Sequence, residues 1–183
     1  ALPISLMTLY LTDATKPEEI LKAKTSGFVH ALKYYPAGAT TNSENGVSNI
    51  DKVSAVLEAM AEIGMPLLVH GEVTDSSIDI FDREKVFIDQ VLKPLIERFP
   101  TLKIVLEHIT TAHAVEFVRS TAGQVGATVT AHHLLYNRTD MLAGGIRPPL
   151  HCLPILKRDI PQPPFHPAVT SGGPRHRTGT AAA

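Results

Sequence analysis

The sequence predicts a parallel α/β fold, and two observations carry this prediction. Short apolar runs rich in Val, Ile and Leu recur along the chain, and each is typical of a strand buried on both faces. Between them lie segments whose apolar residues recur at helical spacing. Strands that alternate with helices form a parallel sheet with right-handed crossovers. The expected strands lie at residues 6–11, 28–32, 65–69, 103–107 and 126–131.

Each expected helix lies between two of these strands. A capping residue, an early proline and two acids begin the first helix near Thr15, and Gly27 ends it. The expected helices span residues 15–27, 50–63, 81–99 and 111–120. The periodicity leaves open whether the sheet curves into a (β/α)8 barrel or stays an open doubly wound sheet. No glycine-rich phosphate loop of the GxGxxG or GxxxxGK type is present, which disfavours a nucleotide-binding version.

Composition and charge restrict the class of protein. The 183 residues are 44% hydrophobic and 19% charged, which is ordinary for one soluble globular domain. A formal net charge of −1 gives no basic face for nucleic acid, and no apolar run approaches the roughly 18 residues of a membrane span. Cys152 is the single cysteine, so no disulfide forms within the chain. We expect a cytoplasmic protein, with a plant organelle as the alternative.

Three polar residues directly follow buried strands. Lys33 and His70 are separated by 37 residues (70 minus 33), and His70 and His108 by 38 (108 minus 70), so each occupies the same place in successive βα units. That place is the carboxyl end of the strand, where barrel enzymes build their active sites. Two imidazoles on neighbouring strand ends are able to converge on one zinc ion. The alternative is that both are buried core histidines bonded to carbonyl groups.

Lys33 limits the reactions that a site at these strand ends is expected to support. Burying an ammonium group is costly, and burial depresses the pKa of a lysine. A neutral amine either forms a Schiff base with a carbonyl substrate or takes up carbon dioxide as a carbamate, which is an oxygen ligand for metals. The two nearby histidines favour the carbamate over the Schiff base. The alternative to both is a lysine without a chemical role, whose amine extends to the surface. The small, polar loop at residues 34–43 is expected to move over the barrel mouth, or else to be a plain connection.

Other candidate residues are assigned structural roles. His132 and His133 follow the last expected strand, and a structural role is preferred for both. Cys152 has no evident activating base beyond His151, so a packing role is preferred for it.

Three longer motifs lie at residues 33–43, 64–72 and 107–111, and two supporting ones lie at 79–84 and 152–158. In these motifs the sequence closely resembles the bacterial and plant type of dihydroorotase, within the amidohydrolase superfamily. The resemblance covers about residues 6 to 158. It implies a (β/α)8 TIM barrel of the metal-dependent hydrolase type, with two zinc ions bridged by a carbamylated lysine and a hydroxide. The implied reaction interconverts N-carbamoyl-L-aspartate and L-dihydroorotate in pyrimidine biosynthesis.

The resemblance also implies roles for individual residues. Lys33 would be the carbamylated bridge, and His70 and His108 would complete the ligand set of one zinc. Thr40 and Thr41 resemble the loop residues that close on the substrate during catalysis, and Leu153 resembles a backbone contact to the dihydroorotate ring. A homodimer is the oligomer that the family suggests, with small-molecule substrates as the other partners.

The chain also departs from the family pattern. The ligands of the other zinc, a His-x-His pair, would lie before Ala1, and Ala181 stands where the family has an aspartate that acts as general base. Pro149 stands where relatives usually have histidine. We therefore expect an incomplete barrel at residues 1–158 that lacks the first and last strands, a divergent and disordered tail at 159–183, and little or no activity from the chain alone. A hydantoinase-like amidohydrolase and a non-catalytic partner subunit are the alternative functions.

Overall fold

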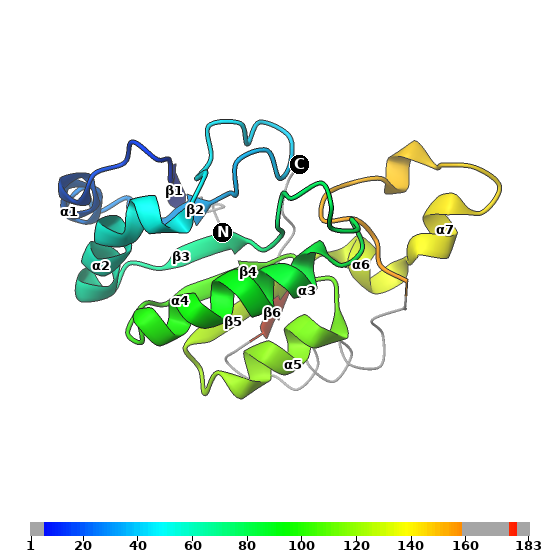
Figure 1. Ribbon diagram of the computed structural model, residues 1–183. Coiled ribbons are helices and arrows are strands. Elements are labelled where there is room, and N and C mark those ends of the chain that lie inside the picture. The colour runs from blue at the N-terminus through cyan, green and yellow to red at the C-terminus, as the bar shows by residue number, and fades with distance from the viewer. Residues whose placement is uncertain (1–5, 159–175, 179–183) are drawn as a thin grey trace, which may run out of the picture.

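The computed structural model describes residues 6–158 and 176–178, and its centre is one parallel sheet (Figure 1). Six strands follow one another in the sheet in chain order, and each pairs in parallel with the next. This order is that of a barrel wall, since a doubly wound sheet reverses its strand order at a switch point. The strands are β1 (Met7–Tyr10), β2 (Val29–Tyr34), β3 (Leu67–His70), β4 (Ile104–Glu107), β5 (Val125–Val129) and β6 (His176–Thr178).

The predicted parallel α/β fold is confirmed, and so is the partial barrel. β1 and β6 are the two edges of the described sheet, which therefore does not close on itself. The strand at His176–Thr178 was not predicted, because this stretch of Pro, Gly, Arg and His has no apolar pattern. The other residues of the predicted tail, 159–175 and 179–183, lie outside the described residues.

The predicted helices are present, with small differences at their ends. Helix α1 begins at Pro17 with Lys16 at its N-cap, so Thr15 is not the capping residue. The third helix is one continuous stretch with a π-helical turn in its middle, a local feature that apolar periodicity does not reveal. The connecting helices are α1 (Pro17–Thr25), η1 and α2 (Ile50–Val53 and Ser54–Ile63), α3, η2 and α4 (Arg83–Phe87, Ile88–Leu92 and Lys93–Arg98) and α5 (Ala112–Ser120).

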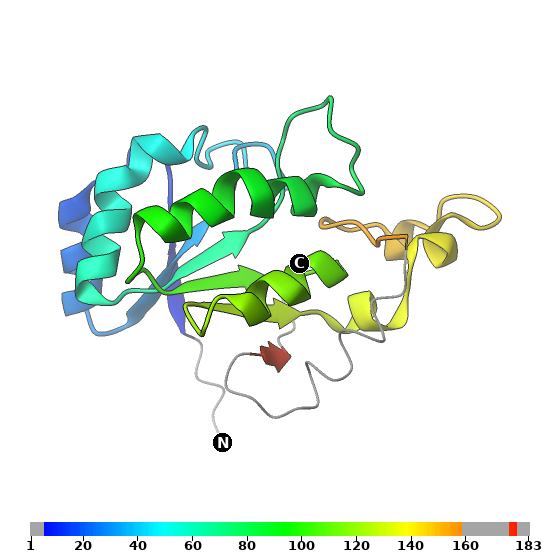
Figure 2. The same ribbon diagram turned by 60° about the horizontal axis from the view of Figure 1, so that its bottom comes forward.

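Residues 131–158 form a separate small layer beyond the carboxyl ends of the strands (Figure 2). β5 ends at Val129, two residues before the predicted end, because the chain turns there into a short helix. This layer contains α6 (Ala131–Leu135), α7 (Arg138–Leu142) and the 3-10 turn η3 (Pro148–Leu150).

Apolar packing holds the strand ends in place. One core cluster joins the inner faces of the helices to the sheet, and it includes Leu57, Phe87, Leu106 and Val115. Burying a side chain of this kind contributes about 1.5–3 kcal/mol. A second, smaller cluster around Met141, Ile155 and Leu156 holds the layer of residues 131–158 together. No helix in the described part of the chain is long and apolar enough to cross a membrane.

Candidate metal centre at the strand ends

Lys33 points to the same side of the sheet as Glu107, two strands away. Its Nζ forms an ion pair with Oε2 of Glu107 at the end of β4, and it lies 4.7 Å from the centre of the Tyr35 ring. Lys33 is only 8% exposed, so it is not a surface lysine. Burial lowers the pKa of Lys33, and the charge of Glu107 offsets this only in part. The side chain is therefore closer to a neutral amine than an exposed lysine is.

The two predicted histidines lie next to each other. The ring centres of His70 and His108 are 4.9 Å apart, and the rings meet edge to face at 66°. Both side chains are buried. Burial, together with the charges of Lys33 and His70, holds the pKa of His108 well below its usual range. At neutral pH, His108 therefore keeps a lone pair that a metal ion is able to use.

His108 carries two signs of a functional residue. Its backbone adopts a φ of 44°, a left-handed conformation that costs a non-glycine residue about 1–2 kcal/mol. The backbone N–H of His108 donates a hydrogen bond of 2.9 Å to the hydroxyl of Thr128, which supports this conformation. Nδ1 of His108 is the one buried side-chain polar atom of the described residues that has no hydrogen-bond partner. Such an atom calls for an explanation, and an imidazole nitrogen in this state has the chemistry of a metal ligand.

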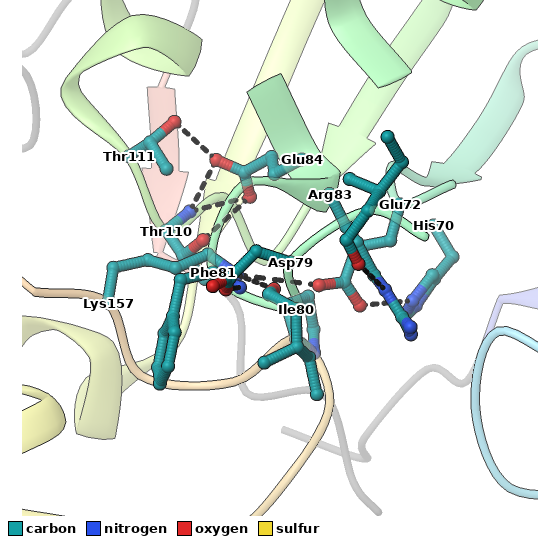
Figure 3. Close-up of polar contacts among 12 residues, drawn as sticks. His70, Glu72, Asp79, Ile80, Phe81, Arg83, Glu84, Thr110, Thr111 and Lys157 are labelled. Atoms are coloured by element: carbon teal, nitrogen blue, oxygen red, sulfur yellow. Dashed lines mark hydrogen bonds and ion pairs between the residues drawn. The ribbon is translucent and has the colours of Figure 1, made fainter. Parts of the chain in front are cut away.

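A buried carboxylate orients the other histidine (Figure 3). Nε2 of His70 lies 3.0 Å from Oε2 of Glu72, whose Oε1 is 3.4 Å from Nζ of Lys157. Burial raises the pKa of Glu72, but the hydrogen bond from His70 and the charge of Lys157 outweigh burial and leave the pKa lowered. Glu72 is therefore an ionised acceptor, so Nε2 of His70 carries the proton and Nδ1 keeps the lone pair. Metal-binding histidines are usually oriented in this way.

A second buried carboxylate fixes the turn that follows His108 (Figure 3). Glu84 on α3 accepts hydrogen bonds from the backbone N–H of Thr110 at 2.9 Å, from its hydroxyl at 2.9 Å and from the hydroxyl of Thr111 at 2.6 Å. Thr111 in turn accepts from the N–H of Ala114 and caps α5. Burial raises the pKa of Glu84, and these donors and Lys157 oppose the rise. Glu84 thus ties the third helix to the strand end that carries His108.

We expect Glu84→Gln to lower the free energy of unfolding by about 1–3 kcal/mol, because the amide places a donor where two hydroxyls and an N–H need acceptors. Chemical denaturation measures this loss. Glu97→Gln is the matched control, since Glu97 lies exposed on α4 and the change should have almost no effect. Equal stability of the two variants would contradict the role given to Glu84.

The predicted substrate residues lie on two segments outside the strands, the loop after β2 and the layer of residues 131–158. The loop after β2 is fastened by Ser43, whose Oγ accepts from the N–H of Thr40 at 2.9 Å and donates to its carbonyl at 2.6 Å. Thr40 is half-buried and Thr41 is exposed. Leu153 packs against the second apolar cluster. Among the residues that the structure describes, no hydrogen bond connects Thr40 or Thr41 to Lys33.

The base near Cys152 is a different histidine from the predicted one. Nε2 of His132 lies 2.7 Å from Sγ of Cys152, whereas His151 is exposed. The chain folds back over α6 and brings the two together, which a sequence separation of 20 residues does not show. His133 is buried and has a structural environment, since it bonds to the hydroxyl of Thr130 and, at 2.8 Å, to the carbonyl of Pro154.

The strand order and the helices that connect the strands together define a partial (β/α)8 barrel. Solved structures of a D-hydantoinase and of dihydropyrimidinase from Brevibacillus agri share this fold with TM-scores of 0.69 and 0.73, at 19% and 15% identity. Each comparison covers 90% of this chain and 40% of the other. No protein-family model matches the chain.

Among proteins of this fold, the chain is similar in sequence to dihydroorotases. The dihydroorotases of Pseudomonas fluorescens (strain SBW25) and Stutzerimonas stutzeri are 63% and 64% identical to it over 178 residues, or 97% of the chain. The crystal structure of dihydroorotase from Campylobacter jejuni matches 97% of the chain with a TM-score of 0.87 at 37% identity. The chain spans about half the length of these relatives, 51% in each case.

Proposed function

We propose that this chain supplies one zinc site of a dihydroorotase, which interconverts N-carbamoyl-L-aspartate and L-dihydroorotate. Lys33, His70 and His108 are the ligands in this proposal. The observation that carries it is the buried, unpartnered Nδ1 of His108 beside His70 and a lysine whose pKa is lowered by burial. High identity to dihydroorotases supports the choice of substrate over other cyclic amides.

The donor set suits zinc. Two imidazoles supply nitrogen, and the amine of Lys33 gains two oxygens if it adds to carbon dioxide. In that step the nitrogen lone pair forms the N–C bond, and the amine loses a proton to solvent. Glu107 must release Lys33 first, and its side chain is 25% exposed, so it has room to turn outward. A bound zinc would polarise the ring carbonyl and lower the pKa of a bound water.

The substrate residues stay a proposal on the sequence resemblance. Thr40 and Thr41 lie on the loop above the strand ends, where closing of the loop would bring them to the substrate. Leu153 lies on the segment that also carries Lys157, and Lys157 contacts Glu72 beside His70. The metal ligands and the proposed ring contact are thus connected through buried residues. A homodimer is a further proposal, which light scattering tests.

A non-catalytic barrel subunit is the second candidate function. The exposed side chains of β1, which include Met7 and Leu9, would suit a partner at this edge of the sheet. A hydantoinase-like activity has weaker support, since the likeness to hydantoinases is one of fold alone.

Zinc content per chain, measured by elemental analysis in bicarbonate buffer, tests the proposal. We expect about one zinc, which is lost when His70 or His108 is replaced by alanine. His113→Ala is the control, since His113 lies on α5 and bonds to Asp89 away from the site. Zinc-dependent binding of L-dihydroorotate in preference to a hydantoin, measured by calorimetry, tests the substrate. No zinc in the native chain would favour the non-catalytic subunit.

A further inference from the structure

A second group of metal-ligand side chains lies on the layer of residues 131–158, and its residues differ from those of the proposed zinc site. His132, His133 and Cys152 each offer a ligand atom, and these atoms all lie within 4.8 Å of one another. Nε2 of His132 and Sγ of Cys152 are 2.7 Å apart and share a hydrogen bond. A metal ion bound between them would replace the proton of that bond.

We propose that His132 and Cys152, with His133 as a third ligand, form an accessory site for a zinc-class transition-metal ion. Imidazole and thiolate are the ligands that such ions prefer. Binding forms a bond between Sγ and the metal and releases the thiol proton to solvent, with no change of oxidation state. His132 and Cys152 are half-buried, so an ion is able to reach them from solvent.

The surroundings of the two histidines agree with this assignment, whereas burial raises the pKa of the Cys152 thiol, whose proton the metal has to displace. Burial lowers the pKa of His132, and burial together with the charge of His132 lowers the pKa of His133 to about 4. Both rings are therefore neutral at pH 7, as metal binding requires. His133 now uses its nitrogens for Thr130 and Pro154, so it has to give up one hydrogen bond to bind. We therefore expect the accessory site to bind more weakly than a site whose ligands are all free.

The site would connect two parts of the layer. His132 lies on α6, whereas Cys152 directly precedes Leu153, the proposed substrate contact. A bound ion would fasten the segment of Leu153 to α6.

Cobalt(II) is the probe that separates this site from the strand-end site. Lys33, His70 and His108 contain no sulfur, so a thiolate-to-cobalt charge-transfer band reports Cys152 alone. We titrate the full chain with Co²⁺ in the presence of a phosphine reductant and follow the near-ultraviolet absorbance. The band should appear in the native chain and persist in His108→Ala, whether or not the strand-end site binds zinc.

Two variants and one control complete the test. Cys152→Ser should remove the band, and His132→Gln should raise the cobalt concentration at half-saturation by at least about tenfold. His113→Gln should leave the titration unchanged. Circular dichroism checks folding, and Cys152→Ala replaces the serine variant if that variant unfolds. Absence of the band in the native chain, or an unchanged titration of His132→Gln, would overturn the proposal.

Discussion

Replacing Lys33 with alanine should abolish the zinc binding that bicarbonate supports. A change beside a metal ligand costs about 10–100-fold in affinity, so removal of the ligand itself should cost more than about 100-fold. Competition with a chromophoric chelator measures the zinc affinity with and without bicarbonate. Carbon-13 NMR in labelled bicarbonate should show a carbamate signal in the native chain and none in Lys33→Ala.

Two further lysine variants separate ligand chemistry from charge. Lys33→Arg keeps the cation that pairs with Glu107, yet a guanidinium does not take up carbon dioxide, so zinc binding should be lost as in the alanine variant. Lys103→Ala is the matched control, because Lys103 lies exposed just before β4, at the opposite end of the sheet. Zinc affinity that is independent of bicarbonate in the native chain would show that Lys33 is no carbamate ligand. Borohydride trapping would then test the Schiff base.

The positions of the strand-end residues could be predicted from the sequence because they depend on local patterns. Each apolar run ends at a polar residue, and nearly equal spacing places Lys33, His70 and His108 on successive units of one sheet. The choice between a barrel and a doubly wound sheet could not be made this way, since it depends on which strands pair. The observed chain order of strands decides it.

The supporting charges could not be predicted from local patterns. Glu84 lies in a charged stretch at the start of a helix and resembles a solvent-facing residue, yet it is buried and satisfied by Thr110 and Thr111. Glu72 and Lys157 meet across 85 residues of sequence. His132 and Cys152 likewise meet only because the chain folds back over α6. Such pairs depend on tertiary contacts, which the periodicity of one sequence does not contain.

Lys157→Met should cost about 3–5 kcal/mol of unfolding free energy, because it leaves the buried carboxylate of Glu72 without its cation. Methionine keeps most of the volume of the side chain, so the loss reports charge more than packing. Lys52→Met is the matched control, since Lys52 pairs with Asp13 on the surface and its loss should be hardly measurable. Denaturation curves of the two variants give the comparison.

Lys157 should also act on the metal site as a positioning residue. It helps to keep Glu72 ionised, and ionised Glu72 holds the proton of His70 on Nε2, which leaves Nδ1 for zinc. Zinc affinity of Lys157→Met should therefore fall about 10–100-fold, and nitrogen-15 NMR should show His70 losing its single tautomer. Adding Glu72→Gln should restore much of the stability, because no unpaired charge remains buried, but not the tautomer. Full zinc affinity and an unchanged tautomer in Lys157→Met would mean that the buried pair of Lys157 and Glu72 stabilises the fold but does not position His70.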